Sequence, residues 1–332
     1  MKPPQRVKWL FDVERGKTAA KHINGYLMDG PDVFVESRRT AFCDKPLVFG
    51  SMPNDGGYLS DYDDDAKNAI TAKYPQVCEL FRRLVGSQES INNISRWCLW
   101  LKGVSPKVMR SIPPVMEAVE KVRQMRFASK REATHKLAET PHLFGEIRQP
   151  ESGQYLLIPS VSSEKRQYVP MSFLSADIIA NNLALIVPNA TLYHFGVLTS
   201  SVHMAWMRMV CGRLEMRYRY SAAIVYNNFP WPDGVPGGHA LPSRNVSEAS
   251  DESELVKRQI EKTAQGILDA RALYPDSSLA DLYDPLTMPP ELRKAHAAND
   301  AAVMKAYGWP TDLSESEIVS RLFAMYATLA KE

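Results

Sequence analysis

The spacing of apolar and polar positions divides the chain into a strand-rich middle and a helical end. Between residues 143 and 230, short apolar runs alternate with Pro, Gly, Ser and Asn, a pattern that predicts strands. Beyond residue 250 the apolar positions recur every three or four residues, which predicts helices over 254–272, over 289–308 and from 314 onward. We therefore expect an α+β fold with mixed and antiparallel strands, flanking helices and an all-α carboxy-terminal region.

Further elements are expected in the first two thirds of the chain. Apolar positions at helical spacing predict one helix from residue 64 to about 85, and Pro113-Pro114 opens another that runs to about residue 139. The shorter elements are strands over 96–101, 155–158, 183–187 and 191–198, and a helix between 203 and 210.

The charged run over residues 211–221 differs from the other predicted strands. If it is a single strand, one of its faces carries Arg213, Glu215, Arg217 and Arg219. Arg can hold guanine through two hydrogen bonds, and a carboxylate can accept one from the amino group of cytosine. The run therefore predicts either a surface that reads base pairs or an ordinary solvated strand face.

Composition and net charge alone give no sign of a nucleic-acid partner. Of 332 residues, 45% are hydrophobic and 23% charged, which is typical of a globular protein, and the formal net charge is only +2. Within the basic stretch over residues 96–136, Arg123, Arg126 and Lys130 recur at helical spacing and form a ridge. This ridge predicts contacts with DNA phosphates or, alternatively, a solvated helix side.

Cysteine usage and the start of the chain predict the compartment. The four cysteines lie far apart and form no CxxC pair, and the first five residues are polar rather than a signal peptide. No apolar run approaches the length of a membrane span. We therefore expect a reduced, cytoplasmic protein with no membrane partner.

No catalytic, cofactor-binding or metal-binding motif is recognisable in the chain. The glycines have neither phosphate-loop nor dinucleotide-binding spacing, and no HExxH or GxSxG occurs. Residues 227–232 read Asn-Asn-Phe-Pro-Trp-Pro, with the aromatic before the proline, so a structural turn is expected rather than a base-flipping Asn-Pro-Pro-aromatic loop. Asp32 and Glu36 leave a metal-dependent nuclease or hydrolase as an alternative, although their spacing is short for such a site.

Two polar loops between predicted strands offer further groups for DNA contact. Ser162, Ser163, Lys165 and Arg166 form a loop whose hydroxyls and charges suit contacts with the DNA backbone. At another strand junction, Asn189 can hold adenine with two hydrogen bonds, and the small Ala190 beside it leaves room for a partner side chain.

Nine longer segments are more specific together than any single motif. In chain order they read INGYL at 23–27, FGSMPNDGG at 49–57, RWCLWL at 96–101, PSVSSEKR at 159–166, HFGVL at 194–198, RLEMRYRYS at 213–221, YNNFPWP at 226–232, LADLYDP at 279–285 and AHAAND at 295–300. This set resembles the carboxy-terminal part of the MmeI-like DNA methyltransferases, the type IIL restriction–modification enzymes. The resemblance covers essentially the whole chain.

The resemblance implies a division of the chain and a role for it. Residues 1–90 would be the end of a methyltransferase domain, 91–232 a target recognition domain, 233–250 a linker and 251–332 a helical carboxy-terminal domain. The family methylates adenine in double-stranded DNA with S-adenosylmethionine, and this part would choose the site.

The family's cofactor loop and Asn-Pro-Pro-aromatic loop are absent from the sequence. We therefore expect no bound cofactor and no catalytic residue in this chain, with a methyltransferase catalytic domain as its partner in cis or in trans. The alternative is a stand-alone specificity or interaction module that serves a separate catalytic subunit.

The same resemblance assigns the base-reading positions. It places a pair of base-reading side chains at Glu215 and Arg217, and it matches Arg219 and Asn189-Ala190 to further specificity positions. We expect Arg213 to touch only backbone or solvent.

Overall fold

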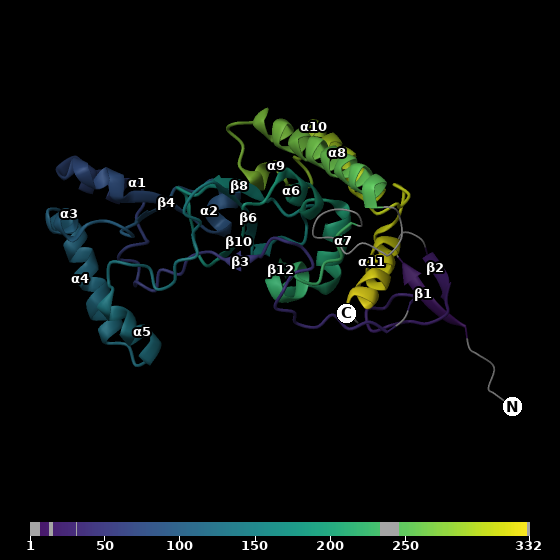
Figure 1. Ribbon diagram of the computed structural model, residues 1–332, viewed down its shortest axis with the longest axis horizontal. Coiled ribbons are helices and arrows are strands. Elements are labelled where there is room, and N and C mark those ends of the chain that lie inside the picture. Colours follow the sequence, from purple (N-terminus) through teal and green to yellow (C-terminus); the bar gives the residue numbers. More distant parts are fainter. Residues whose placement is uncertain (1–6, 13–15, 31, 233–245, 331–332) are drawn as a thin grey trace.

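The computed structural model describes residues 7–12, 16–30, 32–232 and 246–330. The molecule is elongated (Figure 1). A lobe of helices forms one end, strands occupy the middle, and long helices with a small hairpin form the other end.

The strands of the described part are short. They are β1 (Lys8–Asp12), β2 (Gly16–Ala20), β3 (Val48–Phe49), β4 (Phe81–Val85), β5 (Trp97–Leu99), β6 (Gln154–Pro159), β7 (Val161–Ser162), β8 (Ser172–Ser175), β9 (Ile179–Ala180), β10 (Ala184–Pro188), β11 (Gly212–Leu214) and β12 (Arg217–Arg219).

The two longest helices of the chain, α8 (Val246–Ala272) and α10 (Pro290–Ala306), lie near its carboxyl end. In chain order, the helices of the described part are α1 (Asp64–Lys73), the 3₁₀ helix η1 (Pro75–Leu80), α2 (Ser87–Asn92), α3 (Pro106–Arg110), α4 (Pro113–Phe127), α5 (Glu132–Lys136), the 3₁₀ helix η2 (Leu137–Glu139), α6 (Leu192–Leu198), α7 (Ser201–Val210), the π-helix η3 (Ala222–Tyr226), α8 (Val246–Ala272), α9 (Leu279–Leu282), α10 (Pro290–Ala306) and α11 (Glu315–Leu329).

The central sheet is antiparallel, with strand order β3-β10-β6-β8. Apart from the exposed Gln154 at the start of β6, its two middle strands are apolar, and Leu156, Ile158 and Leu185 are completely buried. A sheet covered on both faces loses the alternation of apolar and polar residues, which explains the continuous apolar runs of β6 and β10. Two smaller sheets flank it, with the orders β11-β12-β7 and β5-β4-β9.

One hydrophobic core joins the central sheet to the carboxy-terminal helices. It contains Leu156 of β6, Trp206 of α7, Ile260 of α8 and Leu322 of α11. A buried amide adds to this contact, because Nδ2 of Asn299 on α10 donates to the Gly196 carbonyl of α6 at 2.8 Å. The helices therefore pack onto the strand-rich part as one body.

The predicted fold class is confirmed. The chain combines several small sheets with many helices, and its end is helical. The strands predicted over 155–158 and 183–187 are β6 and β10, and the three carboxy-terminal helices are α8, α10 and α11.

Three predicted elements were wrong in type or extent. The helix expected over 64–85 ends at Lys73, and its last residues form the strand β4, which pairs with β5 and β9. The helix expected to reach residue 139 breaks after Phe127. The strand expected over 191–198 is the helix α6, whose amino end is capped through Thr191 and His194.

The segments assigned by resemblance share structure across their predicted borders. β3, within residues 1–90, pairs with β10, and β4 pairs with β9. Of the predicted linker over 233–250, residues 233–245 lie outside the described part, and α8 begins at Val246. Within the part of the chain that the structure describes, no helix is long and apolar enough to cross a membrane.

Candidate nucleic-acid interface

The charged run over 211–221 is a hairpin rather than a single strand. β11 and β12 pair antiparallel, with Leu214 opposite Arg217, so Glu215 and Met216 form a two-residue turn. Glu215 has φ 57°, in the left-handed region that residues other than Gly, Asn and Asp rarely adopt. The single-strand prediction was wrong because the turn reverses the chain in the middle of the run.

The reversal redistributes the charged side chains. Tyr218 of β12 and Tyr220 just after it are buried, and Arg217 and Arg219 alternate with them toward the other face. The guanidinium of Arg213 instead lies 4.1 Å from the ring centroid of Tyr218, its cross-strand partner. Arg217 and Arg219 therefore share a face as predicted, whereas Arg213 belongs to the opposite one.

A hollow of about 320 Å³ lies beside Arg217. The register of β12 against β7 places Ser162 opposite Tyr218, which brings the predicted loop to the hairpin. Ser162, Ser163, Arg166 and Arg217 all line this hollow. Four residues predicted from separate segments are thus gathered at one site.

The polar groups of this hollow are incompletely satisfied in the free protein. Ser162 is buried at 4% exposure, and its hydroxyl has no hydrogen-bond partner within the described part of the chain. Burial lowers the pKa of the half-buried Arg166, and the carboxylate of Asp284 offsets part of this effect. Lys165 is exposed at the rim, where its backbone N–H donates to Oγ of Ser163 at 3.3 Å. A buried donor without a partner favours a ligand that supplies acceptors.

Asn189 and Ala190 lie elsewhere. β10 and β6 run antiparallel, with Pro188 opposite Tyr155 and Ala184 opposite Pro159. Asn189 therefore follows one end of this strand pair, and the serine loop follows the other, about 13 Å or more away at the rise of a strand. Asn189 has φ 54° and is exposed, so a ligand can reach it.

Ala190 corrects the prediction for this junction. It is 4% exposed and belongs to the main core. A methyl group packed in this way cannot contact a base. Ala190 therefore contributes to the junction only as a small residue of the core.

Arg126 also corrects the prediction, because it is a structural residue. Its side chain is fully buried and donates to the backbone carbonyls of Pro53, Asn54, Leu137, Thr140 and Leu143 at 2.8–3.1 Å. It cannot reach a phosphate from this position. The guanidinium instead ties α4 to two loops.

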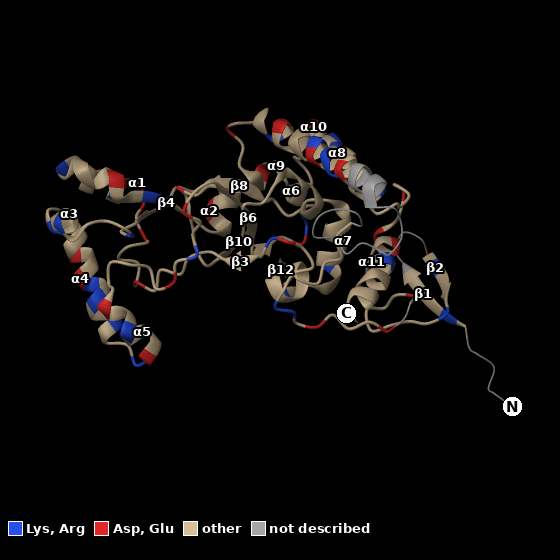
Figure 2. Cartoon of the chain, in the orientation of Figure 1, with Lys and Arg blue, Asp and Glu red and all other residues tan. Residues whose placement is uncertain are grey.

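The rest of the predicted ridge is exposed on the helical lobe. Arg123 lies 4.0 Å from the carboxylate of Glu120, and Lys130 is exposed just beyond the end of α4. Both basic and acidic positions occur along α4 and α5, and this lobe stands apart from β12 (Figure 2). Arg123 and Lys130 therefore form a separate patch from the hollow at Arg217.

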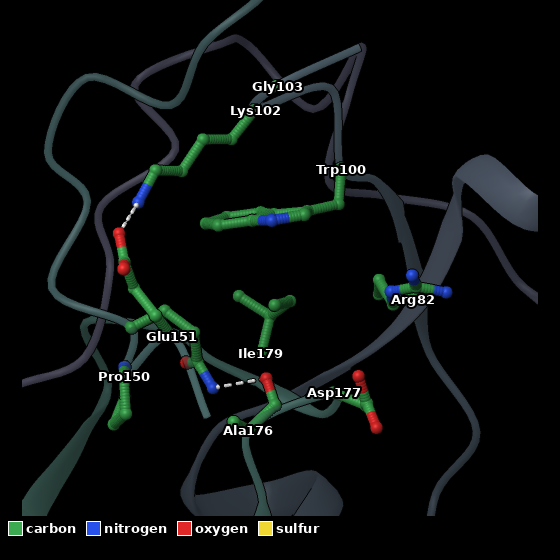
Figure 3. Close-up of a pocket in the computed structure, with 10 residues that line it drawn as sticks. Arg82, Trp100, Lys102, Gly103, Pro150, Glu151, Ala176, Asp177 and Ile179 are labelled. Carbon is green, nitrogen blue, oxygen red and sulfur yellow. Dashed lines mark hydrogen bonds and ion pairs between the residues drawn. The ribbon is translucent and has the colours of Figure 1, made fainter. Parts of the chain in front are cut away.

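A second hollow of about 340 Å³ lies beside the small sheet β5-β4-β9, where Arg82 of β4 and Ile179 of β9 line it together with loop residues. The indole of Trp100 extends across it between Lys102 and Ile179 (Figure 3). Its charges are partly satisfied within the chain, since Nζ of Lys102 lies 3.0 Å from Oε1 of Glu151. None of the predicted site residues lines it.

The structure also shows the contacts of two other sequence motifs, the one at Asn227-Asn228 and the one that contains Asp32. Asn227 and Asn228 donate from their side chains to backbone carbonyls, including those of Arg38 and Glu36, so the predicted structural turn is what forms. Asp32 lies 3.0 Å from His22. No cluster of His, Cys, Asp and Glu able to hold a metal ion occurs among the described residues.

The structure also brings α2 to the hollow, which no motif indicated. Gln88 and Asn92 line it opposite the serine loop. The only signal in the sequence is their spacing of four, which places both side chains on one face of a helix.

Two models of known protein families match most of the chain. The family model described as MmeI, target recognition domain, matches residues 29–233, and that described as MmeI, C-terminal domain, matches residues 252–332. The chain belongs to the MmeI family. The resemblance inferred from the sequence is thereby confirmed.

Two relatives extend this comparison. DNA methyltransferase A of Bacillus subtilis (strain 168) is 37% identical over 326 residues, which are 98% of this chain and 34% of that protein. A solved structure of the type IIL restriction–modification enzyme MmeI in complex with DNA is 38% identical, with a TM-score of 0.84 over 99% of this chain and 42% of that one. The chain thus spans about a third of the curated relative.

Proposed function

We propose that this chain is the sequence-specific DNA-recognition part of an adenine-specific restriction–modification methyltransferase. The observation that carries the proposal is the hollow beside Arg217. There the exposed hairpin adjoins the guanidinium of Arg166 and the buried Ser162 hydroxyl, which has no partner in the described part of the chain. Guanidinium and hydroxyl groups on a rigid strand pair suit the acceptors of DNA bases and phosphates. The DNA-bound relative and the DNA methyltransferase relative support the same role.

The methyl transfer itself would be carried out by a catalytic domain, in cis or in trans. S-adenosylmethionine would bind to that domain, because no glycine-rich cofactor motif occurs in this sequence. The exposed apolar side chains of Phe11, Leu27 and Phe34 suit burial against such a domain. Because the DNA of a bacterium lies in the cytoplasm, we place the function there.

The test is selection of bound sequences from a random duplex library by the 332-residue chain. The wild type should enrich one motif, and Arg217→Ala should relax one base position by about 1–3 kcal/mol. Arg258→Ala is the matched control, since it removes an exposed Arg of α8 that does not line the hollow. A folded wild-type chain that enriches no sequence would refute the proposal.

A further inference from the structure

The wall of the hollow that faces the serine loop is the outer side of α2. Ser87 and Ile91 point into the protein at 9% and 6% exposure. Gln88 and Asn92 each follow one of these buried residues, so both project from the adjacent, exposed side. Both line the same hollow as Arg217 and Ser162.

This helix is fixed in place by contacts at its amino end. Oγ of Ser87 donates to the Leu183 carbonyl at 2.6 Å and accepts from the Ser160 backbone N–H at 3.0 Å. A Cβ at Gly86 would lie 2.6 Å from Oδ1 of Asn181, so the residue before α2 packs closely against the loop before β10. The exposed side chains of α2 are therefore held at a set distance from β7 and the hairpin.

Gln88 and Asn92 are also bonded to each other. Nδ2 of Asn92 donates to Oε1 of Gln88 at 2.8 Å and to the Gln88 carbonyl at 3.1 Å. Both N–H groups of Asn92 are used in these two bonds, so the pair retains Nε2 of Gln88 as a donor and Oδ1 of Asn92 as an acceptor.

A donor beside an acceptor is the complement of one base in the major groove. Adenine presents N7 as an acceptor and its N6 amino group as a donor, whereas guanine presents two acceptors. Arg217, which offers donors alone, suits guanine, so the two walls of the hollow are complementary to different purines.

We infer that Gln88 and Asn92 are a further pair of specificity-determining residues, which holds adenine at a base pair near the one contacted by Arg217. The inference rests on the proposed function, because it assumes that DNA enters this hollow. The Ser162 hydroxyl, which has no partner among the described residues and belongs to the same hollow, independently points to a ligand there.

The experiment uses the full 332-residue chain, duplex libraries and a base analogue. The double variant Gln88→Ala/Asn92→Ala should lose preference for adenine at one motif position by about tenfold and keep the preferences at the others. Gln124→Ala is the matched control, because Gln124 is also an exposed amide bonded to the residue four positions earlier on its helix. It should leave the motif unchanged.

A second measurement needs no variant. In duplexes of the selected motif, 7-deazaadenine at that position removes the N7 acceptor and should weaken wild-type binding several-fold, with no further effect on the double variant. If the wild type enriches a motif that depends on Arg217 but the double variant and the analogue change nothing, this inference is overturned and the proposed function stands. If the folded wild type enriches no motif, both are overturned.

Discussion

Oε2 of Glu215 lies 2.8 Å from Nη2 of Arg217, across the turn that joins β11 to β12. The carboxylate is 77% exposed and the guanidinium 43% exposed, so both are open to solvent while they are paired. The pair orients the Arg217 fork before any ligand arrives. It also places a negative charge at a surface proposed to meet the DNA polyanion.

We expect Glu215→Gln to weaken discrimination and strengthen non-specific binding. The change replaces an acceptor-only carboxylate, which suits cytosine, with an amide that also donates and suits adenine, so the preference at that position should fall by about tenfold. Binding to random duplex DNA should tighten by up to about fivefold, the size of one exposed ion pair. Both effects are measured by titration of the selected duplex and a scrambled duplex at several salt concentrations.

The matched control for this change is Glu164→Gln, which removes one carboxylate from the nearby loop without touching the pair. It should alter non-specific binding at most, because no contact links it to Arg217 among the described residues. Discrimination that persists in Glu215→Gln would contradict the role of the pair.

The hairpin shows why its geometry could not be read from the sequence. A two-residue turn with a positive φ at its first position is usually marked by Gly, Asn or Asp, but this turn is Glu215-Met216. The alternation within residues 217–220 was predictable, since Arg217 and Arg219 flank the buried Tyr218. The chain reversal at Glu215-Met216 was not predictable, because neither residue is typical of such a turn.

Arg126 offers a second change with a large expected effect. Arg126→Met should lower the free energy of unfolding by about 3–5 kcal/mol, because five backbone carbonyls lose their donor in a buried site. Arg123→Ala on the same helix is the control and should change stability by about 0.5 kcal/mol or less. Urea unfolding followed by circular dichroism measures both, and equal midpoints for the two variants would contradict the structural role.

The position of Arg126 could in part have been anticipated. Val115, Val119 and Val122 form the buried stripe of α4, and Arg126 falls four residues after the last of them, on the same stripe. The sequence alone does not show what a guanidinium would bond to there, because its carbonyl partners lie outside the helix, two of them 72 and 73 residues earlier in the chain. By contrast, α11 was predicted correctly, because its Ser314 capping box and amphipathic spacing are local features.

The contact between α6 and α8 depends on the absence of a side chain at Gly196. A Cβ at this position would lie 2.6 Å from Cγ2 of Ile260 and 3.1 Å from Cβ of Ala264. Gly196→Ala should therefore destabilise the protein by about 1–3 kcal/mol through overpacking. Thermal unfolding measures the effect.

Gly266→Ala is the counterpart on the partner helix. A Cβ at Gly266 meets nothing within 4 Å, and alanine favours the helix by up to about 1 kcal/mol, so this variant should be as stable as the wild type or more so. Destabilisation of similar size at both positions would show that the close approach of Gly196 is not the cause.

Asp300 links α10 to the strand-rich part and gives stability a pH dependence. Its carboxylate accepts from the Tyr168 hydroxyl at 2.6 Å and from the Ser201 backbone N–H at 2.7 Å. Burial raises its pKa from 3.8 to about 6, although these hydrogen bonds lower it in part. The folded state therefore binds a proton more tightly than the unfolded chain, and this contribution to stability is full below about pH 4 and lost as the pH rises through about 6.

The wild type should accordingly gain about 1 kcal/mol of unfolding free energy from this group between pH 7.5 and pH 5. The side chain of the Asp300→Asn variant cannot titrate. The unfolding free energy of the wild type minus that of the variant should therefore increase by the same amount from pH 7.5 to pH 5. Urea unfolding of both proteins at the two pH values isolates the effect, because every other titrating group is common to them. A difference that does not change with pH, or that changes in the opposite direction, would mean that the Asp300 carboxyl stays ionised in the folded protein.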